Sequence, residues 1–187
     1  MNTLLGADRP LLTADEFCAI DQHTFGDAWR YELVDGRVVA MAPTTDKHAL
    51  ILSNLIVAVA AALAAAGLPC RVFSGNGVRP ANALNRRVRI PDATVMCRNG
   101  KRRRPVVLFE VLSPSNEGPE YAERFDDLKQ VESVEEIVEL AQDSVEARIH
   151  RRHEGGWQVG EARGEEAALK LHSLGVSVPM AALYADL

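Results

Sequence analysis

An almost uninterrupted apolar stretch from residue 49 to residue 66 limits the possible folds of this chain more than any other feature. The stretch is mostly alanine and approaches the length that spans a membrane. It also contains Ser53 and Asn54, and Gly67 follows it directly, as is common where a helix ends. We therefore expect a helix over about 47–66 that lies across a sheet in a protein core, with no membrane contact.

Turn and strand signals around this helix predict a mixed α/β sheet in a single domain covering residues 1–187. Asp35-Gly36 separates two β-prone runs, which is the strongest short-range signal for a β-hairpin. Single helices between strands, without a regular repeat, indicate a mixed sheet flanked by helices, with 93–97 and 106–112 at its centre. The expected strands are 31–34, 37–41, 71–73, 77–79, 93–97, 106–112, 134–140, 145–151 and 157–159, and the other expected helices are 13–22, 119–131 and 179–184.

The charge and the cysteine pattern exclude several classes of protein. A formal net charge of -5 argues against a protein that coats nucleic acid nonspecifically. Cys18, Cys70 and Cys97 are far apart and form no CxxC motif, so neither a disulfide framework nor a zinc site is indicated. The first residues lack the pattern of a secretory signal. The expected compartment is the reducing cytoplasm.

Two acids stand at the ends of adjacent apolar segments. Pro91-Asp92 precedes one apolar run and Glu110 ends the next. A carboxylate beside a hydrophobic core is costly unless it is paired, solvated or bound to a cation, and carboxylate oxygens are preferred ligands of Mg²⁺. Two interpretations are open from the spacing: a metal site, or Asp92 capping a turn while Glu110 faces solvent or an arginine.

Two basic clusters and one histidine also lie near these acids in the sequence. The clusters are Arg86 to Arg89 and Lys101 to Arg104, each preceding one of the acid-bearing segments. They suit contacts with phosphate, but they could equally keep an acidic protein soluble, or lie at the opposite end of the strands from the acids. His48, near the start of the long helix, is either a structural residue or a hydrogen-bonding partner near the active site.

Short motifs follow one another along the chain in an order typical of one family. They are Tyr31-Glu32-Leu33-Val34-Asp35-Gly36, Met41-Ala42-Pro43, His48, Arg71-Val72-Phe73, Gly77-Val78-Arg79, Pro91-Asp92, Glu110-Val111-Leu112-Ser113-Pro114-Ser115, and Ser173-Leu174-Gly175 with Leu183-Tyr184. Together they resemble the Uma restriction-endonuclease family of the PD-(D/E)XK nuclease superfamily. The resemblance implies an α/β, restriction-endonuclease-like core: a mixed β-sheet flanked by helices, with an N-terminal β-hairpin.

The resemblance also implies a site. Asp92 corresponds to the acid of the PD element and Glu110 to the acid of the (D/E)XK element, so both are expected to bind Mg²⁺ or Mn²⁺ for hydrolysis of DNA phosphodiester bonds. The carbonyl of Val111 is the expected third ligand. Glu32 resembles an additional catalytic acid, although an exposed hairpin residue paired with a neighbouring arginine is an equally open interpretation.

The chain departs from the family at the signature lysine. That position is Leu112, and the following helix offers Arg124, or Lys129 one to two turns later. Arginine keeps the charge but cannot exchange a proton, so we expect weak catalysis. The alternatives are a catalytically impaired module that binds nucleic acid or a protein partner, and a metal-free structural protein. A homodimer is expected by analogy with nucleases that cut both strands.

Overall fold

The computed structural model describes residues 3–4, 10–25, 30–81, 85–113 and 118–187. The chain forms two compact units. Unit 1 comprises residues 1–44, 77–90 and 119–132, and unit 2 comprises residues 45–76, 91–118 and 133–187.

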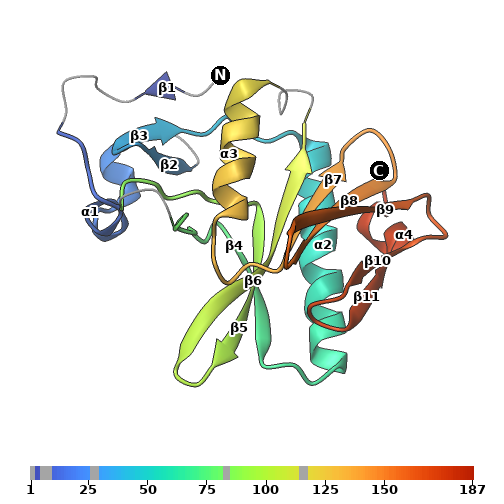
Figure 1. Ribbon diagram of the computed structural model, residues 1–187. Coiled ribbons are helices and arrows are strands. Elements are labelled where there is room, and N and C mark those ends of the chain that lie inside the picture. Colours follow the sequence, from blue (N-terminus) through green and yellow to red (C-terminus); the bar gives the residue numbers. More distant parts are fainter. Residues whose placement is uncertain (1–2, 5–9, 26–29, 82–84, 114–117) are drawn as a thin grey trace. The chain divides into compact units, whose positions relative to one another are not determined.

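Unit 2 is built on a mixed sheet. In its described part the sheet has six strands in the order β4-β5-β6-β7-β8-β9 (Figure 1). β6 and β7 are parallel, and the other neighbours are antiparallel. The mixed α/β architecture predicted from the sequence is confirmed, and β5 and β6 are both interior strands. The strands are β4 (Cys70–Ser74), β5 (Ala93–Asn99), β6 (Arg102–Leu112), β7 (Glu136–Ala141), β8 (Glu146–His153) and β9 (Gly156–Arg163).

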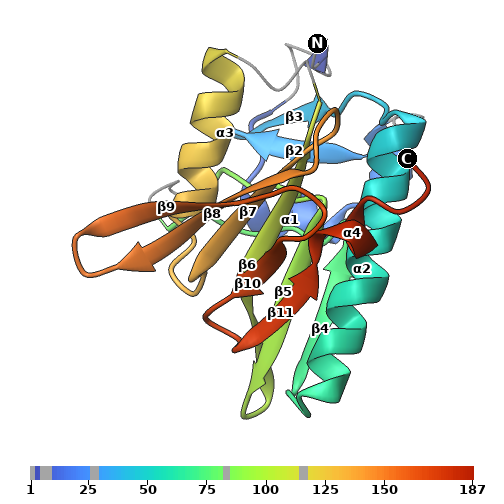
Figure 2. The same ribbon diagram turned by 90° about the vertical axis from the view of Figure 1, so that its right-hand side faces the viewer.

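The apolar helix α2 (Asp46–Ala65) packs against this sheet through one face. The buried side chains Ile51, Leu55, Val59 and Leu63 recur every four residues and join the core of unit 2. In Figure 2, α2 runs beside β4, and it also contacts β11 (Val176–Pro179) and α4 (Met180–Leu183). Among the described residues α2 is the one helix long and apolar enough to cross a membrane, and its outer face is exposed. The prediction of a core helix is confirmed for the sheet-facing side.

A second small sheet lies near the end of the chain. β10 (Ala168–Leu171) and β11 form an antiparallel hairpin that the sequence analysis did not predict. Glu136 explains its turn, because this carboxylate, 1% exposed, accepts hydrogen bonds from the backbone amides of His172 and Ser173. The hairpin is therefore held by a distant acid as well as by its own turn, in which Gly175 has a φ of 63°.

Unit 1 contains the predicted β-hairpin. β2 (Tyr31–Val34) and β3 (Arg37–Ala40) pair around Asp35 and Gly36, whose φ angles of 49° and 80° suit a tight hairpin turn. Helix α1 (Ala14–Ala19) begins with the predicted capping box between Thr13 and Glu16. The strand expected at 77–79 is reduced to a single bridge between Val78 and Arg89. The remaining elements are β1 (Thr3–Leu4), a 3-10 turn (Gln22–Phe25) and α3 (Pro119–Lys129).

A disulfide bond joins Cys70 to Cys97, so the expectation of unpaired cysteines is wrong for these two. They are 27 residues apart in the sequence, but the antiparallel pairing of β4 with β5 places them directly opposite each other. Cys18 is free and exposed. Because disulfides are typical of oxidising compartments or of redox-active cytosolic sites, the cysteine pattern no longer supports the cytoplasmic prediction.

Candidate active site

Two buried carboxylates lie opposite each other on neighbouring strands of unit 2. Asp92 directly precedes β5, and Glu110 lies near the end of β6. The register pairs Ala93 with Phe109, and its continuation by one residue sets Asp92 opposite Glu110 on the same face of the sheet. The two acids are 5% and 4% exposed. The structure therefore brings together the acids that the sequence singled out.

The Asp92 carboxylate is oriented by a histidine and by a backbone amide. Its Oδ2 accepts a hydrogen bond of 2.9 Å from the Val111 amide and lies 3.0 Å from His48 Nε2. His48 is buried in the first turn of α2, where its amide donates to the N-cap residue Thr45. The Thr45 hydroxyl in turn donates to Gln142 Oε1 at 2.6 Å. The structure thus assigns Asp92 to contacts with β6 and α2 and not to the capping of a turn.

A third acid, which the sequence analysis missed, lies beside Glu110. The parallel register of β6 and β7 pairs Glu110 with Glu139, which is 5% exposed. Glu139 Oε2 lies 2.7 Å from His150 Nε2 and 3.7 Å from the Arg148 guanidinium. His150 is itself only 8% exposed, so it is a buried partner of Glu139. The available signal was an acid inside the otherwise apolar run 137–140.

Glu32 and Arg124, the other predicted catalytic residues, meet in unit 1. Glu32 is 1% exposed, and its Oε1 accepts hydrogen bonds from the Ile90 amide at 2.7 Å and from Arg124 Nε at 3.3 Å. Arg124 also donates to the Ile90 carbonyl at 2.9 Å. Glu32 is therefore a buried member of an ion network, and the interpretation as an exposed hairpin residue is wrong. Lys129 contacts the Asp126 carboxylate and the Phe125 ring.

Two arginines of the first basic cluster, Arg87 and Arg89, belong to the same ion network in unit 1. Arg89 is 4% exposed and binds Glu32 at 3.1 Å and Asp127 at 2.7 Å. Arg87 binds Asp127 and, through two hydrogen bonds of 2.7 and 2.9 Å, Asp35. These bonds from Arg87 hold the pKa of the Asp35 carboxyl below its usual value. Arg87 and Arg89 are thus internal ion-pair partners, a role that neither open interpretation of the cluster included.

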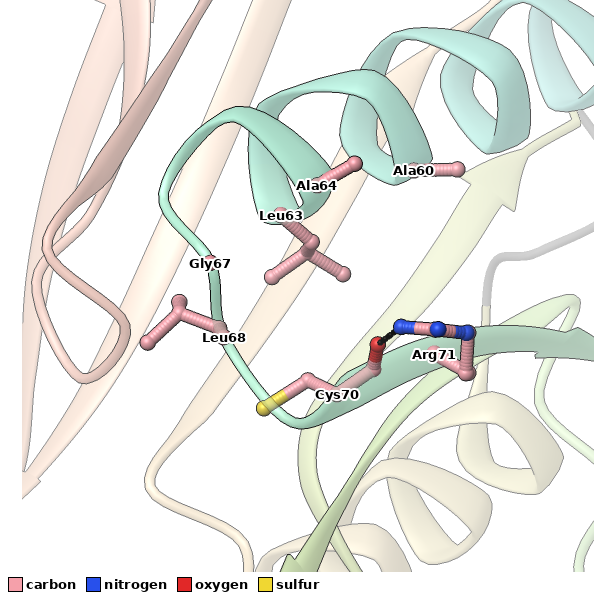
Figure 3. Close-up of a pocket in the computed structure, with 7 residues that line it drawn as sticks. All are labelled: Ala60, Leu63, Ala64, Gly67, Leu68, Cys70 and Arg71. Carbon is pink, nitrogen blue, oxygen red and sulfur yellow. Dashed lines mark hydrogen bonds between the residues drawn. The ribbon is translucent and has the colours of Figure 1, made fainter.

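The second basic cluster lies at the far end of β6 from the acids. Arg104 and Glu110 are six residues apart on one strand, which corresponds to about 20 Å. A cavity of about 420 Å³ also lies away from the acids, between the end of α2 and the start of β4 (Figure 3). None of its described lining residues is acidic, and Arg71 is its one charged side chain. The cavity is therefore not the site of the acids.

The donors gathered around Asp92 have the chemistry that a hard cation prefers. Asp92 and Glu110 offer carboxylate oxygens, and the Val111 carbonyl points to the same side of β6 as the Val111 amide that binds Asp92. All three are oxygen donors, which suit Mg²⁺ or Mn²⁺ better than Zn²⁺. Within the described residues, no group of three or more His, Cys, Asp and Glu side chains is arranged to hold a metal. Any ion here would therefore be bound by two carboxylates, backbone oxygen and water.

The chain is similar in structure to a protein of known structure, and its sequence matches the model of a protein family. The chain is similar to a crystal structure described as "a putative nuclease belonging to DUF820 from Anabaena variabilis", with a TM-score of 0.69, 14% identity, and coverage of 93% of this chain and 98% of that chain. This similarity shows an α/β, restriction-endonuclease-like fold. Residues 14–181 match the family model described as "Uma2: Putative restriction endonuclease". The chain therefore belongs to the Uma2 family. A comparison with curated proteins gives no match.

Proposed function

We propose that this protein is an endonuclease that uses Mg²⁺ or Mn²⁺ to hydrolyse DNA phosphodiester bonds. The observation that carries the proposal is the pair of buried carboxylates Asp92, directly before β5, and Glu110, on β6, which continue the register of these two strands. Burial of two adjacent acids is unfavourable without a compensating cation. Membership of the Uma2 family supports the same activity.

Each residue around the acids has a role in this proposal. Asp92, Glu110 and the Val111 carbonyl would hold the cation, which supplies Lewis-acid stabilisation of the phosphoryl oxygens and a lowered pKa for the attacking water. His48 fixes the Asp92 carboxylate through the 3.0 Å contact of its Nε2. Because His48 lies in the first turn of α2, this contact orients the Asp92 carboxylate toward the start of the helix, where the amide dipoles favour a negative charge.

The position of the signature lysine determines how fast such a site can act. Leu112 lies two residues after Glu110 on β6, so both side chains point to the same face of the sheet. Leucine can neither orient a water nor stabilise charge there. We propose Arg124 as a weak substitute and Glu32 as an additional acid. The Arg124 guanidinium already binds Glu32 and the Ile90 carbonyl, which favours slow catalysis.

A second candidate function follows from the same observation. Because Leu112 occupies the lysine position and Arg124 is engaged within unit 1, the fold could hold nucleic acid or a protein partner without cutting. In this alternative the acids still bind a cation, but cleavage is absent.

Restoration of the lysine separates the two functions. Cleavage of supercoiled plasmid in Mn²⁺ should be slow in the wild type, faster in Leu112→Lys and absent in Asp92→Asn. Leu112→Met is the matched control, because it keeps an apolar side chain of similar size. Faster cleavage by Leu112→Lys, lost again in Leu112→Lys/Asp92→Asn, supports the nuclease site. No cleavage by any folded variant would favour the binding module.

We propose a homodimer, because cleavage of both strands of a duplex is served by two paired active sites. Light scattering coupled to size-exclusion chromatography at micromolar protein should give twice the mass of 20.4 kDa. A mass of one chain throughout would contradict it. We also propose that the protein is cytoplasmic and not attached to a membrane, which fractionation of the expressing cell tests.

A further inference from the structure

Five basic residues are concentrated in a seven-residue segment of unit 2. Residues 98–104 contain five of the chain's 21 lysine and arginine residues, in a protein whose net charge is -5. All five are exposed. We call this segment the basic ribbon; its cations are Arg98, Lys101, Arg102, Arg103 and Arg104.

The basic ribbon projects beyond its neighbours as two antiparallel strands. The pairing of β4 with β5 ends at Cys97, and the pairing of β7 with β6 begins at Val107. From Asn99 to Arg102 the strands β5 and β6 pair with each other around a turn that contains Gly100 with a φ of 62°, and the Arg98 amide beside them still donates to the Pro69 carbonyl at 2.9 Å. Figure 1 shows this hairpin extending at the end of the sheet where β4 begins. A two-stranded ribbon is one of the elements that the major groove of DNA admits.

The register sets like charges against each other. Arg98 lies directly opposite Arg103, and Arg104 lies beside the disulfide-bonded Cys97. Like charges in opposite positions destabilise a strand pair. The Arg103 guanidinium lies 5.6 Å from the centre of the Phe73 ring, which fixes its side chain without neutralising it. The sheet thus maintains a concentration of positive charge at a cost in stability, as expected where an anion binds.

The basic ribbon differs in this respect from the other basic cluster. Arg87 and Arg89 are neutralised by carboxylates within unit 1. In the described part of the chain, by contrast, no carboxylate forms an ion pair with a cation of the basic ribbon. Its charges are therefore available to a ligand.

We infer that the basic ribbon binds the phosphodiester backbone of nucleic acid at a contact separate from the acids. This inference rests on the proposed nuclease function and extends it. Arg104 and Glu110 are about 20 Å apart along β6, a distance covered by about six base pairs of a duplex. The contact is electrostatic and independent of sequence, and it holds the substrate while the acids do the chemistry.

The test measures duplex affinity without hydrolysis. Binding of a 30-base-pair DNA is followed by fluorescence anisotropy in EDTA over a range of salt concentrations. Each phosphate contact contributes about 0.9 to the slope of log K against log salt. The triple variant Arg98→Gln/Arg102→Gln/Arg104→Gln should therefore lower the slope by two to three and weaken binding about 100-fold at 0.1 M salt. The control Arg37→Gln/Arg163→Gln/Lys170→Gln removes three exposed charges elsewhere and should stay close to the wild type.

The outcomes separate this contact from the proposed function. Equal slopes for the triple variant and the wild type, or no DNA binding by the wild type, would overturn the inference. Binding of heparin with the same affinity and the same salt slope as DNA would also overturn the inference, because the surface would then be a general polyanion site. Duplex RNA in place of DNA identifies the preferred backbone. The triple variant should still bind Mn²⁺, because its substitutions lie away from the acids. If the wild type binds DNA through the basic ribbon but binds no Mn²⁺, the proposed metal site is refuted and the inference about the basic ribbon stands.

Discussion

Replacement of Arg89 by methionine should destabilise the protein by about 3 kcal/mol. Arg89 is 4% exposed and connects the carboxylates of Glu32 and Asp127, which are 1% and 3% exposed. Removal of one partner from a buried ion pair costs about 3–5 kcal/mol, because a desolvated charge is left behind. Glu32 retains the Ile90 amide and Arg124, and Asp127 retains Arg87, so we expect the lower end of this range.

Urea unfolding at pH 7, followed by circular dichroism, measures this loss. Arg163→Met is the control, because the Arg163 side chain is 63% exposed and its ion pairs should contribute less than about 1 kcal/mol. Arg89→Met/Glu32→Gln/Asp127→Asn should recover part of the loss, because it removes the buried charges as well. A loss below about 1 kcal/mol for Arg89→Met would refute the view that Arg89 is a desolvated structural residue, and would reopen its assignment to phosphate binding.

Three further predictions concern the disulfide, a buried tyrosine and cooperativity. Cys70→Ser/Cys97→Ser should lose about 3–4 kcal/mol of unfolding free energy relative to the oxidised protein, because the bond closes a loop across a separation of 27 residues. Dithiothreitol should lower the unfolding free energy of the wild type and not that of the double variant. A wild type whose unfolding free energy is unchanged by dithiothreitol would contradict the bond. Burial raises the pKa of Tyr184 from 10.0 to about 12. The stabilisation of the folded state by the neutral Tyr184 hydroxyl is therefore complete below pH 10 and is lost as the pH rises toward 12. The urea midpoint of the wild type should fall over that pH interval, and that of Tyr184→Phe should fall less. Equal falls in the two proteins would contradict this role of Tyr184. Calorimetry should show one transition with equal calorimetric and van't Hoff enthalpies if residues 1–187 unfold as one domain; two separate transitions would show otherwise.

Local chemistry accounts for the parts of the fold that could be predicted. The Asp35-Gly36 turn needs two residues at positive φ, and the capping box needs Thr13 and Glu16 three residues apart. Both motifs can therefore be recognised from a few consecutive residues. The four-residue spacing of the buried α2 side chains is equally local. The two acids were recognisable because Asp92 opens one apolar segment and Glu110 ends the next, and the register of β5 and β6 brings them together.

Features that depend on pairing across the chain could not be predicted in this way. Cys70 and Cys97 meet only because of the β4–β5 register, and Glu139 reaches Glu110 only because β6 and β7 are parallel neighbours. The two basic clusters look alike in the sequence. The structure distinguishes them, because Arg87 finds carboxylates within unit 1, whereas the basic ribbon extends beyond the sheet. Long-range partners, and not residue type, decide these cases.

Calorimetric titration of Mn²⁺ tests the central claim most directly. Wild type, Asp92→Ala and the control Asp143→Ala should be titrated in the same buffer, since Asp143 is an exposed acid of unit 2 that binds Lys47 at 3.2 Å. The account predicts one site per chain in the wild type and in Asp143→Ala, and no binding in Asp92→Ala. Binding that persists in Asp92→Ala, or that is absent from the wild type, would contradict a metal site at Asp92 and Glu110.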